Sequence, residues 1–275
     1  VDYKEHALII NGKEIPVTAQ RDPAQLPHKD YGVEVALEST GFFTDRDGAA
    51  KHLQAGAKKV LISAPATDPD ITVVLGCNDE KLRDDHQIIS NASCTTNCLG
   101  PVVKVLNDSF GIEQGIVTTI HSYTSTQSTV DMAKAASPIK MTRGRAAAAN
   151  TIPTSTGAAK AIGLVFPELN GKLDGMAMRT QTPDGSVIDG KYNLKREASI
   201  DEINSAMKTA ADGPLKGILE YTEDPIVSSD VIANPASSVV CGVFTNVIGN
   251  LCSVLSWYDN EWGYSNRLVD LIIKK

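Results

Sequence analysis

One cysteine of the chain stands where a thiol would be reactive. Cys94 lies in a polar segment, residues 90–98, that follows a short apolar run and opens a helical pattern. The positive end of a helix dipole and the unpaired N–H groups of a first helical turn both stabilise a thiolate, the nucleophilic form. A free cysteine is more often a small core residue, but the serine, threonine and asparagine neighbours of Cys94 favour a nucleophile. Cys98, one turn later, is expected to be structural.

A nucleophilic cysteine needs a base, and His121 is the strongest candidate. It ends the apolar run 116–120, and a side chain at the end of a strand can face a cleft. Imidazole also titrates near neutral pH. Taken alone, a buried histidine with satisfied hydrogen bonds would be the commoner explanation. The other histidines lie among charged residues and are expected at the surface; they are His6, His28, His52 and His86.

Two features indicate an anionic substrate. Residues 154–157, a Thr-Ser-Thr-Gly sequence, lead into a helical pattern and offer hydroxyl and N–H groups of the kind that bind phosphate. Arg143, Arg145 and Arg179 would supply positive charge, and Arg179 ends a mostly apolar run. An ordinary helix cap and solvated surface arginines explain these features equally well when each is taken singly.

The order of helical and strand-like patterns predicts two differently built parts. Up to residue 92, short apolar runs alternate with a helical pattern, which predicts a parallel, doubly wound sheet. Further on, strand-like runs follow one another with few helices between them, which predicts a largely antiparallel sheet. The expected fold class is therefore α/β followed by α+β.

Local signals set several boundaries. Asn11-Gly12 between two apolar runs predicts a tight hairpin. A helix is expected at 94–107, with Pro101 kinking it or delaying its start. Further helices are expected at 154–165 and 262–273, and a strand at 71–75. Residues 124–153 show no clear element, which often marks a functional loop.

Composition argues against several classes of protein. The chain has 275 residues and a net charge of -7, without a dense run of lysine and arginine, so no nucleic-acid partner is expected. Its apolar stretches are strand-sized, so no membrane span is expected. The five cysteines are odd in number, as for reduced thiols in the cytoplasm. They also lack zinc-binding spacing with histidine, so no metal site is expected.

Several segments together resemble the signature of glyceraldehyde-3-phosphate dehydrogenases. The most specific are Ser90 to Pro101, around Cys94, and the tetrapeptide His121-Ser122-Tyr123-Thr124. The remaining matches lie at residues 20–23, 38–41, 62–65, 152–161, 175–179 and 257–266. Their order and spacing fit this family nearly from end to end, which makes the combination highly specific.

The resemblance implies a reaction and an architecture. Cys94 would attack the aldehyde of glyceraldehyde 3-phosphate, with His121 accepting the proton of the thiol. Hydride transfer to NAD would then leave a thioester, which inorganic phosphate would cleave to 1,3-bisphosphoglycerate. The implied architecture is a partial Rossmann-like NAD-binding domain at 1–92, a catalytic domain at 93–258, and a C-terminal helix within 259–275 that returns to the NAD-binding domain. The family also implies a homotetramer.

The resemblance assigns binding residues by position. Thr124 and Arg179 would bind the phosphate of the substrate. The residues implied around the attacking phosphate are Ser93, Thr95, Arg143, Thr156 and Gly157. On the cofactor side the implied residues are Arg21, Ser63, Asn260 and Tyr264, with Asn260 contacting the nicotinamide amide.

The chain departs from the family pattern on the cofactor side. The sequence contains no G-x-G-x-x-G turn, which in this family cradles the dinucleotide pyrophosphate. We therefore expect the first βαβ unit of the NAD-binding domain to be absent from the sequence, together with the acidic residue that would distinguish NAD from NADP. NADP is thus not excluded. Asp184-Gly185-Ser186 also differs from the commoner Asn-Val-Ser sequence.

Three other hypotheses fit part of these observations. Erythrose-4-phosphate dehydrogenase shares the Cys/His pair, although Tyr123-Thr124 and residues 155–160 look more like the glyceraldehyde enzyme. A non-catalytic fragment acting through subunit contacts would fit the missing glycine-rich turn. A cofactor-free cysteine hydrolase would use the same pair of residues, but it would leave the phosphate-binding candidates unexplained.

Overall fold

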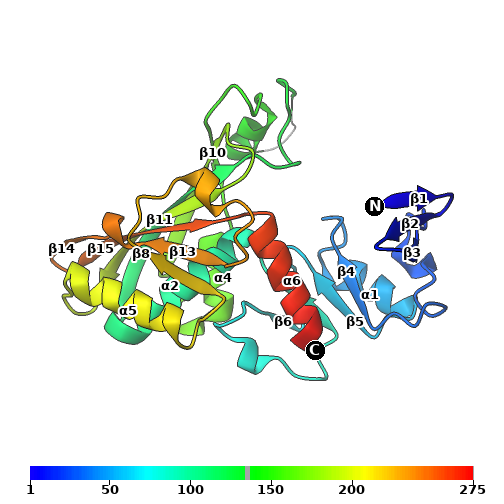
Figure 1. Cartoon of the computed structure of the whole chain (residues 1–275), viewed down its shortest axis with the longest axis horizontal. Coiled ribbons are helices and arrows are strands. Elements are labelled where there is room, and N and C mark those ends of the chain that lie inside the picture. Colours follow the sequence, from blue (N-terminus) through cyan, green and yellow to red (C-terminus); the bar gives the residue numbers. More distant parts are fainter. Residues whose placement is uncertain (134–136, 275) are drawn as a thin grey trace.

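The computed structural model describes residues 1–133 and 137–274 of the chain. These residues form three sheets, and Figure 1 shows the largest on one side of the molecule and the two smaller ones on the other. Helix α6 (Trp262–Lys274) lies between these two sides. Among the described residues, no helix combines the length and the apolar character needed to cross a membrane.

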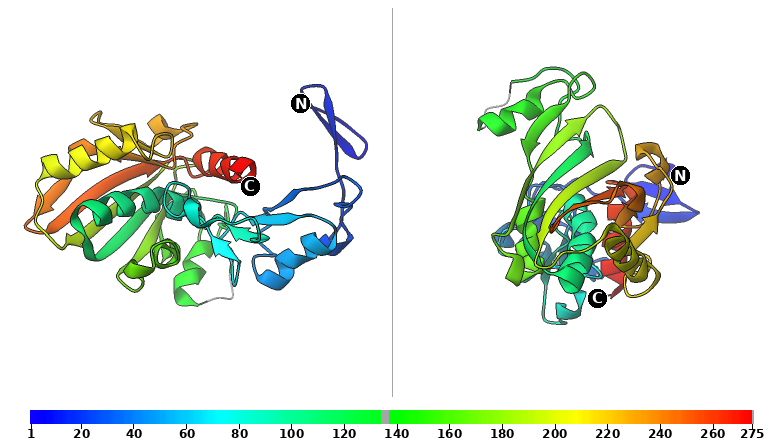
Figure 2. Two further views of the ribbon diagram at one scale, coloured as in Figure 1. Left: turned by 90° about the horizontal axis from the view of Figure 1, so that it is seen from below. Right: turned by 90° about the vertical axis from the view of Figure 1, so that its left-hand side faces the viewer.

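The N-terminal sheet is a small antiparallel ribbon. It consists of β1 (Asp2–Lys4), β2 (Ala7–Ile10) and β3 (Lys13–Pro16). Asn11 and Gly12 link the last two strands with positive φ angles of 50° and 77°, which confirms the expected hairpin. This ribbon extends away from the rest of the chain (Figure 2).

The second sheet is parallel throughout, as the alternating patterns predicted. Its order is β4-β5-β7-β6, and the strands are β4 (Val35–Glu38), β5 (Lys59–Ile62), β6 (Ile71–Thr72) and β7 (Ile88–Ser90). Helix α1 (Arg46–Gln54) starts where the carboxylate of Asp45 accepts a hydrogen bond from Gly48 N at 2.7 Å.

The strand expected at 71–75 is much shorter than predicted. It ends at Thr72 because the side chain of Asn78, and not another strand, forms the hydrogen bonds with the next backbone groups. Asn78 accepts a hydrogen bond from Val74 N and donates one to Thr72 O, both at 2.9 Å. The chain therefore turns away from the sheet at this point.

The large sheet has eight strands and is mostly antiparallel, as expected. Its order is β12-β13-β15-β11-β8-β10-β9, with β14 beside β15, and only the β8–β10 and β12–β13 pairs are parallel. The strands are β8 (Ile112–Ser122), β9 (Ile152–Ser155), β10 (Leu173–Thr180), β11 (Ser186–Leu194), β12 (Leu219–Thr222), β13 (Ser238–Cys241), β14 (Asn246–Ile248) and β15 (Leu251–Tyr258).

Helices cover one face of this sheet and enclose the main core. They are α2 (Cys94–Phe110), α4 (Ala158–Val165) and α5 (Ile200–Asp212). Fully buried side chains such as Leu106, Ile162 and Ile188 fill the space between helices and strands. Pro101 lies buried inside α2 and does not delay its start. Burial of the apolar face of α2 therefore outweighs a proline cost of about 3 kcal/mol.

Two expectations between residues 124 and 165 were wrong. Residues 154 and 155 are not helical but belong to edge strand β9 (Ile152–Ser155), because they pair antiparallel with β10. Helix α4 begins only at Ala158. The segment expected to hold no element contains the short helix α3 (Pro138–Met141) and a 3-10 turn at Thr142–Gly144.

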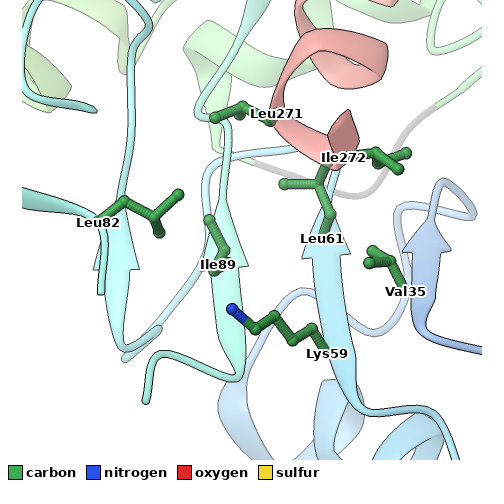
Figure 3. A pocket seen from close by; sticks show the side chains of 7 residues that line it. All are labelled: Val35, Lys59, Leu61, Leu82, Ile89, Leu271 and Ile272. Carbon is green, nitrogen blue, oxygen red and sulfur yellow. The ribbon is translucent and has the colours of Figure 1, made fainter. Parts of the chain in front are cut away.

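Helix α6 confirms the helix expected at 262–273 and packs on the parallel sheet. Its start is fixed by Asp259, whose carboxylate accepts hydrogen bonds from Glu261 N at 2.8 Å and Trp262 N at 2.6 Å. Leu271 then meets Leu61 and Ile89 on the face of the sheet, as Figure 3 shows.

Replacing Leu271 with alanine should destabilise the parallel sheet. The change leaves a cavity in a small core, and the expected cost is about 2–4 kcal/mol of unfolding free energy. Urea unfolding at equilibrium measures it. Val269 is the matched control because it lies on the same helix but is 53% exposed; Val269→Ala should cost far less, and equal costs would show that α6 does not pack as described.

Candidate active site

Cys94 lies at the first residue of α2, directly after the parallel strand β7. The helix is capped by Ser93, whose hydroxyl accepts a hydrogen bond from Thr96 N at 3.1 Å. Ala92 turns the chain through a positive φ of 54°, and its carbonyl accepts a hydrogen bond from the hydroxyl of Tyr264 at 3.0 Å. Sequence, cap and turn together place the thiol at the carboxyl edge of the parallel sheet.

His121 approaches Cys94 from the large sheet. It lies near the end of β8, and its Nε2 is 3.5 Å from the sulfur of Cys94. Its Nδ1 lies 2.7 Å from the carbonyl oxygen of Ser122. Since a carbonyl only accepts, Nδ1 carries the hydrogen and donates it, which leaves a lone pair on Nε2 facing the thiol.

Both members of this pair are uncharged at neutral pH. Burial, helped by the positive charge of Arg179, lowers the pKa of His121 to about 3. Burial also raises the pKa of the Cys94 thiol, while Thr95 and Arg179 act in the opposite direction. The resting proton therefore stays on sulfur, and the neutral imidazole presents its Nε2 lone pair to it.

Arg179 places a positive charge beside the base. It lies opposite His121 in the parallel β8–β10 pair, and its Nη1 donates to the Ser122 carbonyl at 2.8 Å. Nη1 is also 3.1 Å from His121 Nδ1, but these two N–H groups converge on the same carbonyl. Within the described part of the chain, the buried Nε of Arg179 has no hydrogen-bond partner, so a donor remains for an anion.

Thr124 and Arg143 lie close to this charge. Thr124 Oγ1 is 3.5 Å from Nη1 of Arg179. Arg143 reaches edge strand β9, donating from Nε to Thr154 Oγ1 and from Nη2 to Ser155 O, both at 2.9 Å. The charge of Arg143 contributes to the lowered pKa values of both Arg179 and His121.

The expected Thr-Ser-Thr-Gly phosphate loop leads from β9 into α4. Thr156 Oγ1 accepts a hydrogen bond from Ala158 N at 3.2 Å, and exposed Gly157 is the N-cap residue of α4. The first turn of α4 thus follows directly after β9, the strand to which Arg143 donates its hydrogen bonds. The structure brings this loop and Arg143 together as a second place where an anion would find both charge and free donors.

Tyr258 contacts residues on both sides of the site and was not among the sequence-predicted residues. Its hydroxyl is 2.9 Å from Thr95 Oγ1 and 3.0 Å from Thr119 Oγ1. Its ring meets the ring of His121 edge-on, with centroids 5.8 Å apart. The signal in the sequence was the alternation of β15, which buries Tyr258, but nothing local indicated its partners.

The cofactor-side candidates do not all meet in one place. Ser63 follows β5, and its N donates to Glu38 O at 2.9 Å, at the carboxyl edge of the parallel sheet. Asn260 is buried, and its Oδ1 accepts a hydrogen bond from Ser186 at 2.7 Å. Arg21 is exposed before the 3-10 turn Pro23–Gln25, and no hydrogen bond or ion pair joins it to the other described residues of the site.

Two histidines expected at the surface are buried, so that prediction was wrong. His86 is 5% exposed and His52 is 6% exposed. His52 donates or accepts on both ring nitrogens, with Glu38 at 2.9 Å on one side and His28 at 3.0 Å on the other. Glu38 and His28 are distant from His52 in sequence. The charged residues near His52 in the sequence therefore gave no sign that its side chain is buried.

Comparison with known proteins agrees with this geometry. A family model described as "Glyceraldehyde 3-phosphate dehydrogenase, C-terminal domain" matches residues 93–260, and one described as "Glyceraldehyde 3-phosphate dehydrogenase, NAD binding domain" matches residues 1–46. This chain belongs to the glyceraldehyde-3-phosphate dehydrogenase family. The first match alone covers more than half of the 275 residues.

Individual members of the family are closely similar. A glyceraldehyde-3-phosphate dehydrogenase of Mycolicibacterium smegmatis is 61% identical over 91% of this chain and 72% of its own length. That of Priestia megaterium is 57% identical over 96% of this chain and 78% of its own length. Glyceraldehyde-3-phosphate dehydrogenase 1 of Bacillus cereus is 56% identical over 98% and 80%.

The cofactor of the family is NAD, and the residues present fit it. The buried Nδ2 of Asn260 has no hydrogen-bond partner among the described residues, so it is a donor that remains available to a ligand. An amide carbonyl such as that of nicotinamide would satisfy this donor. Tyr264 lies nearby in the chain and contacts the turn just before Cys94.

Replacing Arg179 with alanine should move the pH dependence of thiol alkylation to higher pH. The cation of Arg179 lowers the pKa of Cys94, so its removal favours the uncharged thiol. The rate of reaction with iodoacetamide as a function of pH measures this. Arg145→Ala is the control, because Arg145 is exposed and pairs with Asp131. A profile for Arg179→Ala that does not move, or moves to lower pH, would contradict the electrostatic role.

Proposed function

We propose that this chain catalyses the phosphorylating oxidation of glyceraldehyde 3-phosphate to 1,3-bisphosphoglycerate with NAD, a reaction of glycolysis and gluconeogenesis. The observation that carries the proposal is the contact of 3.5 Å between the Cys94 sulfur and His121 Nε2, beside an arginine with a free buried donor. It is supported by 56–61% identity to proteins named glyceraldehyde-3-phosphate dehydrogenase.

Cys94 and His121 perform the covalent chemistry in this proposal. The sulfur attacks the aldehyde carbon while Nε2 takes the thiol proton, which gives the oxyanion of a thiohemiacetal and an imidazolium that can return the proton to that oxygen. The Ser122 carbonyl accepts the Nδ1 hydrogen in both states, so the ring does not need to turn. NAD, when bound, supplies the acceptor for the hydride that leaves the thiohemiacetal carbon.

Two anion-binding regions serve the two phosphates. Arg179 lies beside the base and Thr124 contacts Arg179, so we assign both to the phosphate of the substrate. The phosphate that cleaves the thioester is assigned to a second group of donors around the starts of α2 and α4. Its members are Ser93, Thr95, Arg143, Thr156 and Gly157.

The cofactor side is assigned to residues from several segments. Asn260 would donate from Nδ2 to the nicotinamide amide, with Tyr264 beside it. Ser63 is at the carboxyl edge of the parallel sheet, where nucleotides bind in open α/β folds. We keep Arg21 as a cofactor-side candidate on the family resemblance alone.

The proposed division of the chain follows the sheets. Residues 1–92 would form a partial NAD-binding domain and residues 93–258 the catalytic domain. Residues 259–275 would carry the helix that returns to the first domain, in line with the packing of Leu271 on the parallel sheet. We also propose that the enzyme acts in the cytoplasm, where its five unpaired thiols stay reduced.

The chain should turn over glyceraldehyde 3-phosphate only with an intact Cys94. NADH formation from glyceraldehyde 3-phosphate, NAD and phosphate measures the reaction by absorbance. Cys94→Ser should abolish it, and His121→Asn should slow it on the order of 10²–10⁴-fold, as for loss of a general base. Retained turnover in Cys94→Ser would exclude the covalent mechanism.

Cys98→Ser is the matched control for this experiment. Cys98 lies one helical turn after Cys94, and its sulfur faces the hydroxyls of Ser238 and Ser256. A serine hydroxyl fits those polar surroundings, so turnover should stay close to that of the unmodified chain. An equal loss in both variants would show that the helix, and not the nucleophile, had been disturbed.

We further propose a homotetramer, in which copies of the chain cover the face of the large sheet that carries no helices. Neighbouring side chains on β8 divide between the two faces: Val117 is buried under the helices, while Ile116 is 65% exposed. Ile116 stands between Asp174 on β10 and Lys191 on β11. A single exposed isoleucine flanked by opposite charges is complementary to the same face of a second copy.

Ile116→Asp should lower the mass of the assembly in sedimentation analysis while leaving the circular dichroism spectrum unchanged. Replacing an apolar side chain with a carboxylate, which must lose its water on burial, would weaken any interface built on this face. Leu164→Asp is the control, because Leu164 is 61% exposed on α4, a helix on the opposite face of the sheet. An unchanged mass for Ile116→Asp would show that this face is not the interface.

A further inference from the structure

Ser186 forms hydrogen bonds with both β8, the strand that carries His121, and Asn260, the residue assigned to nicotinamide. It is the first residue of β11 and is fully buried. Its Oγ accepts a hydrogen bond from Ser122 N at 3.1 Å. The hydrogen of the hydroxyl is therefore free to be donated elsewhere, and it points to Asn260 Oδ1 at 2.7 Å.

This contact decides which end of the Asn260 amide faces the cofactor. The two ends of an asparagine amide are nearly the same in shape, so only hydrogen bonds distinguish them. In the structure the hydroxyl of Ser186 donates to the oxygen of this amide. It therefore leaves Nδ2 on the other side, where this buried group finds no acceptor within the described part of the protein.

We propose that Ser186 is a positioning residue for cofactor binding. By holding Oδ1 of Asn260, it presents Nδ2 as a donor to the carboxamide oxygen of nicotinamide. Without this hydroxyl, the amide can turn over and present its oxygen, which repels a carbonyl. The proposal rests on the assignment of Asn260 under the proposed function and adds a residue that acts through it.

The surroundings of Ser186 are rigid enough for this role. The hydroxyl of Ser122 donates to Gly185 O at 3.1 Å, in addition to the hydrogen bond from Ser122 N to Ser186. Strand β8 therefore binds both residues at the start of β11. Gly185 has a positive φ of 85°, and a side chain there would come within 2.2 Å of Ser228 O. Ser186 also pairs with Tyr258 on β15. These contacts leave the hydroxyl little freedom to move away from Asn260.

The test compares binding of NAD with binding of ADP-ribose, which lacks the nicotinamide ring, by titration calorimetry on the native enzyme. Ser186→Ala should weaken NAD binding about 10-fold, the effect of losing one well-oriented hydrogen bond. Binding of ADP-ribose should stay unchanged, since it makes no contact with Asn260. Equal losses for both ligands, or no loss for either, would overturn the proposal. Ser238→Ala is the matched control, because Ser238 is equally buried but lies against Ser256.

A double mutant separates this proposal from the assignment of Asn260. Asn260→Ala should weaken NAD but not ADP-ribose, and adding Ser186→Ala to it should cause no further loss, because Ser186 acts through the amide. A further 10-fold loss in the double mutant would refute that route. If Asn260→Ala leaves NAD binding unchanged, the assignment of Asn260 fails and this proposal fails with it. If Asn260→Ala weakens NAD binding and Ser186→Ala does not, only the role of Ser186 fails.

Discussion

The Cys94 sulfur lies 3.5 Å from His121 Nε2. This contact requires a strand of the parallel sheet and a strand of the large sheet to end close to each other. Strand β7 delivers Cys94 to the start of α2, and β8 delivers His121 from the large sheet. Helix α2 makes this possible because its N-terminus touches the parallel sheet while its buried side chains fill the core under the large sheet. The position of α2 therefore fixes both the reactive thiol and the relation between the two sheets.

In the part of the chain that the structure describes, the positive charges near His121 are not balanced by a nearby carboxylate among the causes of its lowered pKa. Arg179 and Arg143 are both partly buried, each has its pKa lowered, and each disfavours the imidazolium form of His121. A bound anion would relieve this like-charge repulsion and make protonation of His121 easier at the same time. In the proposed mechanism, binding of the phosphorylated substrate and acceptance of the thiol proton would therefore be energetically linked through Arg179.

Local sequence singled out the contacting pair Cys94 and His121 better than the architecture around it. These two candidates stand out because a polar helix start and the end of an apolar strand are visible in adjacent residues. Edge strand β9 was not predicted, and its last two residues were taken for helix, because its extended form depends on pairing with β10, which is distant in sequence. Tyr258, Ser186 and the buried His52 were missed for the same reason, since each has its important partners far along the chain.

The packing of α6 also bears on how the protein is made. Leu61 of β5 lies early in the chain, yet part of its cover is Leu271 of α6, which a ribosome reaches only after the whole large sheet has been translated. Until then, an apolar face of the parallel sheet remains open to water. The core under the large sheet also needs β15, which ends at Tyr258 shortly before α6, so both cores are completed only late in translation. A nascent chain of this kind would offer a binding surface to chaperones for most of its translation.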